Sequence, residues 1–172
     1  MHVDFVLAQL RLKRLELNSN SPVMKKKILL ADDDPGVRNT LRRVLESENY
    51  EVTTSANGQE TGTRFRDEMP DQVLLDLNMP DRDGWEVFKL INTTRPLVPV
   101  IIITARPHQF EQAADLGVDA IMEKPLDLPC LLKTIAGYLA ESEKERVQRL
   151  TRPDFHTVLL PEPGEYSSKI GH

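Results

Sequence analysis

The stretch ILLADDD at residues 28–34 decides the fold, because four apolar residues run directly into three carboxylates. A short run without a polar residue is typical of a parallel strand that is covered on both faces. Two later stretches have the same form: VLLD at 73–76 ends on Asp76, and VIIIT at 100–104 ends on Thr104. Together these stretches predict a buried parallel sheet whose strands end in polar side chains.

Helix-forming segments lie between the strand-like segments, in the alternating order of parallel βα units. Asp34 before Pro35 and Asp83 before Gly84 are typical helix start signals. The chain is expected to contain strands at 27–31, 51–55, 72–75, 100–104 and 120–123, and helices at about 34–48, 57–68, 83–94, 107–116 and 127–142. The predicted fold class is α/β, a doubly wound five-stranded parallel sheet with helices on both faces.

The segment before this α/β pattern differs from it in composition. Residues 1–23 end in the polar, turn-forming stretch NSNSP and are interpreted as an N-terminal extension or linker. The alternative is an amphipathic helix over about 3–17 that docks on the domain or on a partner. The domain itself is expected to cover residues 24–142.

The segment after the pattern, residues 143–172, is expected to be a C-terminal tail without a separate effector domain. About thirty residues are too few for an effector that has its own core. The stretch ESEKERVQRL at 141–150 could prolong the last helix. The apolar run VLL at 158–160 is expected to dock either on the domain or on a partner.

Charge and hydropathy exclude several classes of partner. The 172 residues carry 22 Lys and Arg against 27 Asp and Glu, a net charge of −5, whereas a nucleic-acid-binding surface is basic. The longest apolar run, residues 98–103, is far shorter than the roughly 20 residues that cross a membrane. A single cysteine, Cys130, cannot form an internal disulfide. We therefore expect no direct nucleic-acid or membrane partner and a cytoplasmic location.

Polar residues at the strand ends predict the functional site, because ligands of such sheets bind beyond the carboxyl ends of the strands. Asp32 and Asp33 follow the first strand and Asp76 the third, while Thr104 and Lys124 end the fourth and fifth. Carboxylates that are held close together repel unless a cation neutralises them, and oxygen ligands suit Mg²⁺. A carboxylate beside this ion can attack a phosphoryl donor, and an ammonium and a hydroxyl can bind the phosphoryl oxygens.

Four motifs in this order, ILLADDDPGVR, VLLDLNMPDRDGWE, VIIITA and EKP, resemble the receiver domain of two-component response regulators. The resemblance covers about residues 25–141 and implies a flavodoxin-like sheet of strand order 2-1-3-4-5. It implies that Asp76 is the phosphorylated residue. It further implies a Mg²⁺ site formed by Asp32, Asp33, Asp76 and the backbone carbonyl of Asn78, with Thr104 and Lys124 as the phosphoryl-stabilising and switch residues.

The resemblance also assigns roles to residues around this centre. Asn78 and Arg106 match positions that tune phosphoryl hydrolysis, and Pro125 matches a proline that follows a cis peptide bond. Ile121 stands where many receivers have a switch aromatic, so that half of the switch is missing or replaced. Asp34 matches no ligand and is interpreted as a helix cap.

The function implied is Mg²⁺-dependent phosphoryl transfer from phosphohistidine to Asp76. The donor would be a sensor histidine kinase or a histidine phosphotransfer protein. A downstream protein would bind the face formed by the helix at 107–116, the strand at 120–123 and the helix at 127–142. The chain would be a monomer or a phosphorylation-dependent dimer, and it would turn over only its own phosphate. The alternatives are a receiver-like binding module that works without phosphate and an intermediate in a phosphorelay.

Overall fold

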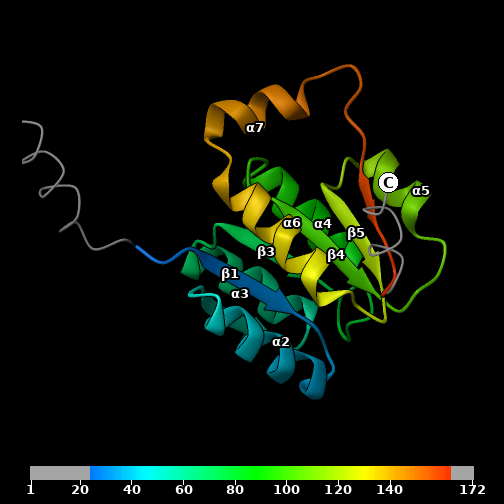
Figure 1. Ribbon diagram of the computed structural model, residues 1–172. Coiled ribbons are helices and arrows are strands. Elements are labelled where there is room, and N and C mark those ends of the chain that lie inside the picture. Colours follow the sequence, from blue (N-terminus) through cyan, green and yellow to red (C-terminus); the bar gives the residue numbers. More distant parts are fainter. Residues whose placement is uncertain (1–23, 164–172) are drawn as a thin grey trace, which may run out of the picture.

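A single parallel sheet forms the centre of the computed structural model, which describes residues 24–163 (Figure 1). The segments 1–23, with the alternative helix at about 3–17, and 164–172 lie outside the described residues. The sheet has six strands in the order β2-β1-β3-β4-β5-β6. They are β1 Lys27–Ala31, β2 Glu51–Ser55, β3 Gln72–Leu75, β4 Val100–Thr104, β5 Ala120–Glu123 and β6 Val158–Leu160. The predicted order 2-1-3-4-5 is confirmed, and a sixth strand, which was not predicted, extends it beyond β5.

Of the six helices in the described residues, five cover the two faces of this sheet and the sixth, α7, lies near one end of it (Figure 1). Their bounds are α2 Pro35–Ser47, α3 Gly58–Glu68, α4 Gly84–Thr94, α5 Phe110–Leu116, α6 Leu128–Ala140 and α7 Glu143–Leu150. Helix α5 begins three residues later than predicted. The reason is local: His108 has a left-handed backbone conformation with φ 59°, which a right-handed helix cannot include.

The apolar side chains of the strands alternate between two cores. Leu29, Val73 and Ile102 point to the face covered by α3, α4 and α5. Leu30 and Leu74 point to the face covered by α2 and α6. Because both faces are covered, the central strands are apolar at consecutive positions, as the sequence predicted.

Local hydrogen bonds fix the beginnings of two helices. The Asp34 carboxylate accepts the N–H groups of Gly36 at 2.7 Å and Val37 at 3.1 Å, so its predicted role as the cap of α2 is confirmed. The Asp127 carboxylate likewise accepts the N–H of Cys130 at 2.9 Å and caps α6.

The segment after α6 does not prolong that helix. Glu141 has an extended backbone conformation, and Ser142 caps the new helix α7 in a reciprocal pair with Glu145. The chain then returns to the sheet, where residues 158–160 pair with β5 as the parallel strand β6. The sequence left open whether this apolar run docks on the domain or on a partner, and in the structure it docks on the domain.

Within residues 24–163, no helix is long and apolar enough to cross a membrane.

Candidate functional site

Three carboxylates meet at the carboxyl ends of β1 and β3, which are neighbours in the sheet. One oxygen each of Asp32, Asp33 and Asp76 lies within 4.8 Å of the others. Asp32 and Asp76 are almost completely buried, at 0% and 1% exposure, whereas Asp33 is exposed. Two buried carboxylates with an exposed third at their rim form a site that solvent reaches from one side, and oxygen ligands of this kind fit a hard divalent cation.

An ammonium group lies between the two buried carboxylates. Lys124 Nζ donates to Asp32 Oδ2 at 2.8 Å and to Asp76 Oδ2 at 2.7 Å. Its side chain follows β5, and the Lys124–Pro125 peptide bond is cis, as expected. Lys124 thus reaches Asp32 and Asp76 from the end of β5 and neutralises part of their negative charge.

Burial and charge act in opposite directions on these groups. Burial raises the pKa of the Asp32 carboxyl above its ordinary value, and the hydrogen bond from Lys124 opposes this only in part. For Lys124, burial alone would lower the pKa, but the hydrogen bonds and charges of Asp32 and Asp76 outweigh it and raise the pKa. The ammonium therefore stays charged at neutral pH.

Thr104 presents a buried hydroxyl beside Lys124. Its Oγ1 accepts the N–H of Arg106 at 3.0 Å, which leaves the hydroxyl hydrogen free to be donated. The Thr104 carbonyl accepts the backbone N–H of Lys124 at 2.8 Å, so the two residues are held together across β4 and β5. The carboxylates, Thr104 and Lys124 thus all lie at the carboxyl ends of their strands, at one rim of the sheet, as the strand pattern predicted.

Arg106 joins the loop after β4 to the loop after β3. Its guanidinium donates to Asn78 Oδ1 at 2.5 Å and to Asp83 Oδ1 at 2.9 Å. The Asn78 N–H in turn donates to Asp76 Oδ1 at 2.9 Å. The resemblance pointed to Asn78 and Arg106 separately, but the hydrogen bond between them was not predicted, because no periodicity links residues 28 positions apart in sequence. Asp83 was predicted only as a helix start. Its carboxylate binds Arg106 and makes no cap hydrogen bond to α4.

A second contact that the sequence did not predict fixes the backbone of Asp32. The Arg38 guanidinium donates to the Asp32 carbonyl from the first turn of α2. Ile121, by contrast, lies outside this polar cluster. It is fully buried in the core under α4 and α5, and it pairs with Ile102 on one side and with Leu159 on the other. Its tuning role stays a prediction.

Gly84 packs directly against the backbone of Asp76 and Leu77, where there is no room for a side chain. A Cβ atom at this position would lie 2.5 Å from the Leu77 Cα and 2.7 Å from the Asp76 carbonyl oxygen. Both neighbours are backbone atoms, which cannot rotate away.

We therefore expect Gly84→Ala to lower the free energy of unfolding by at least about 2 kcal/mol, as for an overpacked core. It should also slow any modification of Asp76, because the backbone of that residue must shift. Gly137→Ala is the control, since nothing lies within 4 Å of a Cβ there. In helix α6 this change should stabilise by about 0.5–1 kcal/mol. Urea denaturation of both variants measures the difference, and equal stabilities would contradict the steric argument.

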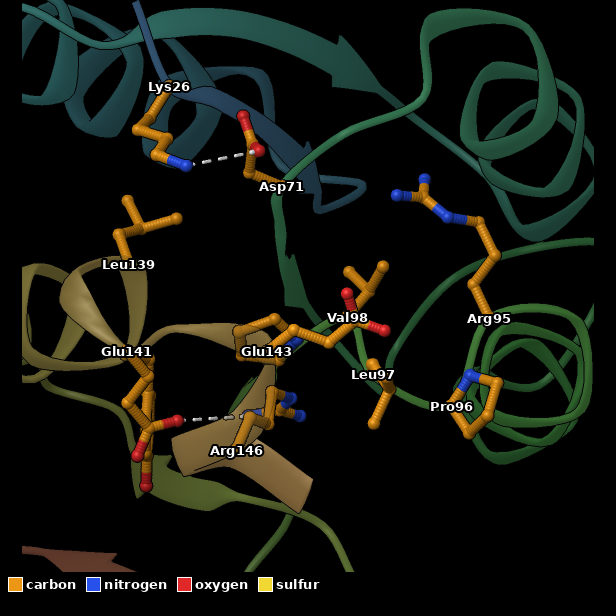
Figure 2. Close-up of a pocket in the computed structure, with 12 residues that line it drawn as sticks. Lys26, Asp71, Arg95, Pro96, Leu97, Val98, Leu139, Glu141, Glu143 and Arg146 are labelled. Atoms are coloured by element: carbon orange, nitrogen blue, oxygen red, sulfur yellow. Dashed lines mark ion pairs between the residues drawn. The ribbon is translucent and has the colours of Figure 1, made fainter. Parts of the chain in front are cut away.

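A pocket of about 610 Å³ lies at the opposite end of the sheet, at the amino ends of the strands (Figure 2). Its charged side chains are largely paired: Lys26 Nζ lies 3.5 Å from Asp71, and Arg146 Nη1 lies 3.6 Å from Glu141. The acidic cluster is not part of this pocket, so the size of the hollow does not identify the chemical site.

Comparison with known proteins agrees with this geometry. A family model described as "Response regulator receiver domain" matches residues 28–136. The alkaline phosphatase synthesis transcriptional regulatory protein PhoP of Bacillus subtilis is 35% identical over 122 residues, which make up 70% of this chain and 51% of that protein. The chain spans about half the length of the curated relatives it matches.

Solved structures share both fold and sequence with the chain. A CheY-like receiver domain protein from Methanospirillum hungatei has a TM-score of 0.66 and 31% identity, over 70% of this chain and 98% of that one. The response regulator TrrA from Thermotoga maritima, solved in complex with Mg²⁺ and BeF, has a TM-score of 0.62 and 30% identity, over 66% and 98%. The motif order, the polar rim of the sheet and these matches lead to one conclusion: the chain belongs to the response regulator receiver domain family of two-component systems.

Proposed function

We propose that this receiver accepts a phosphoryl group on Asp76 from the phosphohistidine of a sensor histidine kinase or a histidine phosphotransfer protein. The observation that carries the proposal is the placement of Lys124 Nζ, 2.7 Å from Asp76 and 2.8 Å from Asp32. An ammonium held between two buried carboxylates is placed to balance the charge of an incoming phosphoryl group. We expect the chain to process only its own phosphate and therefore not to act as an enzyme on other substrates.

The transfer step would use groups that the structure holds in place. An oxygen of the Asp76 carboxylate forms the new bond to phosphorus while the bond from phosphorus to the donor imidazole nitrogen breaks, and that nitrogen keeps the electron pair. Lys124 would then pair with one phosphoryl oxygen. The Thr104 hydroxyl, which has a hydrogen to donate, would bind another.

Mg²⁺ fits the acidic cluster by the chemistry of its oxygen ligands. Asp32, Asp33 and Asp76 would hold the ion, together with the backbone carbonyl of Asn78. When bound, Mg²⁺ offsets the negative charge that the cluster and the phosphoryl group bring together. The similar receiver TrrA was solved with Mg²⁺ and BeF bound, which supports this assignment.

Output is proposed to pass to a protein partner. The relative PhoP is named as a transcriptional regulatory protein, but this chain matches only 51% of it. The net charge of −5 argues against direct binding of DNA by this chain, because DNA is itself negatively charged. A role as a phosphorelay intermediate would use the same site and would be recognised by onward transfer of the phosphoryl group to a second histidine protein. The buried, unpaired Cys130 is compatible with the cytoplasm as the location.

Incubation of the full chain with acetyl phosphate and Mg²⁺ tests the proposal. Intact-mass spectrometry should show the gain of one phosphoryl group, and EDTA should abolish it. A chain that gains no phosphoryl group from acetyl phosphate or from any phosphorylated kinase would instead be a binding module that works without phosphate.

The metal site has its own prediction. Asp33→Asn should raise the Mg²⁺ concentration for half-maximal phosphorylation about tenfold or more, because it removes an exposed anionic ligand without disturbing the core. Asp34→Asn is the matched control, since it changes the same charge one residue further on and asparagine also caps helices well. In the control, the Mg²⁺ concentration for half-maximal phosphorylation should change by less than about twofold. Equal shifts would show a general charge effect and no ligand role for Asp33.

A further inference from the structure

The edge of β5 is closed by the chain itself. Without residues 158–160, β5 would be the last strand of the sheet, with a row of unpaired backbone N–H and C=O groups. Such an edge is a template on which an extended segment can add as a further strand. In this chain β6 takes that place, with Val158, Leu159 and Leu160 in register with Ala120, Ile121 and Met122.

Strand β6 is held by a few specific contacts. The Val158 N–H donates to the Asp119 carbonyl at 3.1 Å. The buried Thr157 hydroxyl lies 2.6 Å from the Val118 carbonyl and 3.2 Å from the Ala113 carbonyl in α5. Leu160 is buried in the core, whereas Val158 and Leu159 are 39% and 54% exposed. The segment therefore contributes a buried hydroxyl at its first position and a buried apolar side chain three positions later, with two exposed side chains between them.

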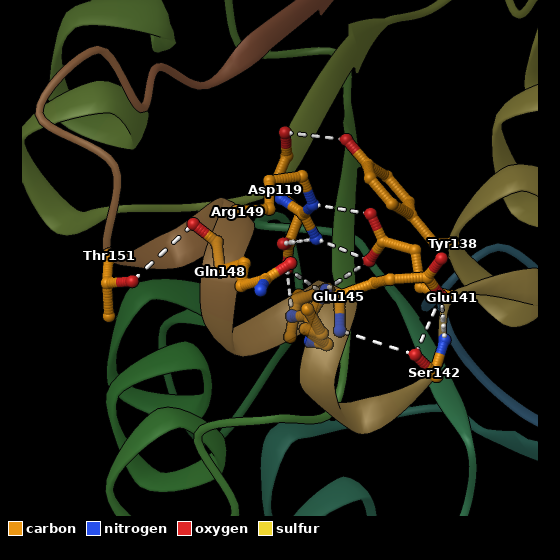
Figure 3. Close-up of polar contacts among 10 residues, drawn as sticks. Asp119, Tyr138, Glu141, Ser142, Glu145, Gln148, Arg149 and Thr151 are labelled. Carbon is orange, nitrogen blue, oxygen red and sulfur yellow. Dashed lines mark hydrogen bonds and ion pairs between the residues drawn. The ribbon is translucent and has the colours of Figure 1, made fainter.

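Helix α7, in contrast, is firmly anchored (Figure 3). Arg146 and Arg149 each donate to the Asp119 carboxylate at 2.9 Å, and Arg149 also donates to Glu141 at 2.6 Å. Asp119 and Arg146 are buried. Residues 151–156, which join α7 to β6, are mostly exposed. An exposed connection thus joins a short edge strand to a fixed helix. The ion pairs that hold α7 involve no residue of β6, so release of β6 would leave them intact.

We propose that the β5 edge is a strand-exchange docking site: the chain's own Thr157–Leu160 segment keeps it closed, and an extended segment of a partner protein with the pattern Thr-x-x-Leu replaces that segment. The occupant seen in the structure defines the chemistry that the site accepts. The edge borders α5 and α6, which form with β5 the face through which the output is expected. The inference rests on the proposed signalling role, but its test requires no phosphate, so either can fail without the other.

The test uses the full chain and a fluorescent peptide with the sequence FHTVLLPE, that of residues 155–162. In the unmodified chain, the tethered strand competes at an effective concentration of about millimolar, so the peptide should bind weakly. Val158→Pro removes the N–H that pairs with Asp119 and should weaken the tethered strand. We expect this variant to bind the peptide at least about tenfold more tightly than the unmodified chain does.

Leu159→Pro is the matched control. Neighbouring residues of a strand direct their N–H groups to opposite sides, so the Leu159 N–H faces away from β5 and its loss should leave peptide binding unchanged.

Thr157→Val, which removes the hydroxyl at nearly constant volume, should again increase binding. Hydrogen exchange of residues 119–123 should rise in Val158→Pro and fall when the peptide is added. The proposal would be overturned if the unmodified chain and the three variants bound the peptide with equal affinity. It would also be overturned if neither Val158→Pro nor Thr157→Val bound the peptide while their circular dichroism spectra were native.

Discussion

Asp76→Asn should abolish phosphorylation of this chain by acetyl phosphate or by a phosphorylated kinase. The amide has no anionic oxygen to attack phosphorus, and loss of a nucleophile lowers such rates by about a thousandfold or more. The fold should persist, because asparagine has the same shape and its oxygen can still accept the Asn78 N–H. Lys124 also keeps its ion pair with Asp32 at 2.8 Å. Intact-mass spectrometry and a thermal melt of the same sample measure both effects.

Asp81→Asn is the matched control for this variant. Asp81 is exposed in the loop after β3 and has a left-handed backbone with φ 70°, a conformation that asparagine adopts readily. The control should be phosphorylated at the normal rate, and its adduct should be removed by neutral hydroxylamine, which cleaves acyl phosphates. An unaltered adduct in Asp76→Asn would place the modification on another residue. Loss of the fold would show that the Asp76 charge is structural.

Asp119→Ala should cause the largest loss of stability. The Asp119 carboxylate accepts the Val100 N–H at 2.9 Å and binds the guanidinium groups of Arg146 and Arg149. The Arg146 side chain is only 5% exposed. The change leaves Arg146 with Glu141 at 3.6 Å as its remaining ion pair. Removal of one partner from a buried ion pair costs about 3–5 kcal/mol. Urea denaturation, with the slope compared to that of the unmodified chain, measures the loss.

An exposed ion pair supplies the comparison for this effect. Arg42 and Glu46 lie 2.8 Å apart on the surface of α2, with side chains 51% and 43% exposed. Arg42→Ala should lower stability by no more than about 0.5 kcal/mol, because water solvates the remaining carboxylate. If Asp119→Ala cost as little as Arg42→Ala, the cluster around Asp119 would contribute no more than a surface pair.

The predictable part of this fold is the part that hydrophobic patterning determines. Each of the five predicted strands has the bounds expected for it. The clearest cases are the runs 73–75 and 100–103, which are apolar at consecutive positions and are followed by a polar residue. The candidate site followed from the same pattern. Parallel strands end at one edge of a sheet, so Asp32, Asp76 and Lys124 had to meet there once the strands were drawn correctly.

The C-terminal segment could not be predicted in the same way. A three-residue strand such as β6 has too short a pattern to be distinguished from a loop, and its position depends on a free edge at β5. Helix α7 did carry a signal, the Ser-x-x-Glu pattern at 142–145, which is typical of a new helix start. The partnership of Arg146 with Asp119 has no local signal, because the two residues are 27 positions apart.

Helix α7 also determines where this receiver could be cut and joined to another protein during evolution. A recombination breakpoint after residue 142, where the α/β pattern of the sequence ends, would keep the acidic cluster but remove both arginines that neutralise Asp119. Tyr138 would lose its Arg149 neighbour as well, although its hydroxyl, whose pKa burial raises to about 12, would still donate to the Asp119 carbonyl. A transferable module therefore ends beyond α7, and hybrid regulators built from this chain should retain residues 143–150.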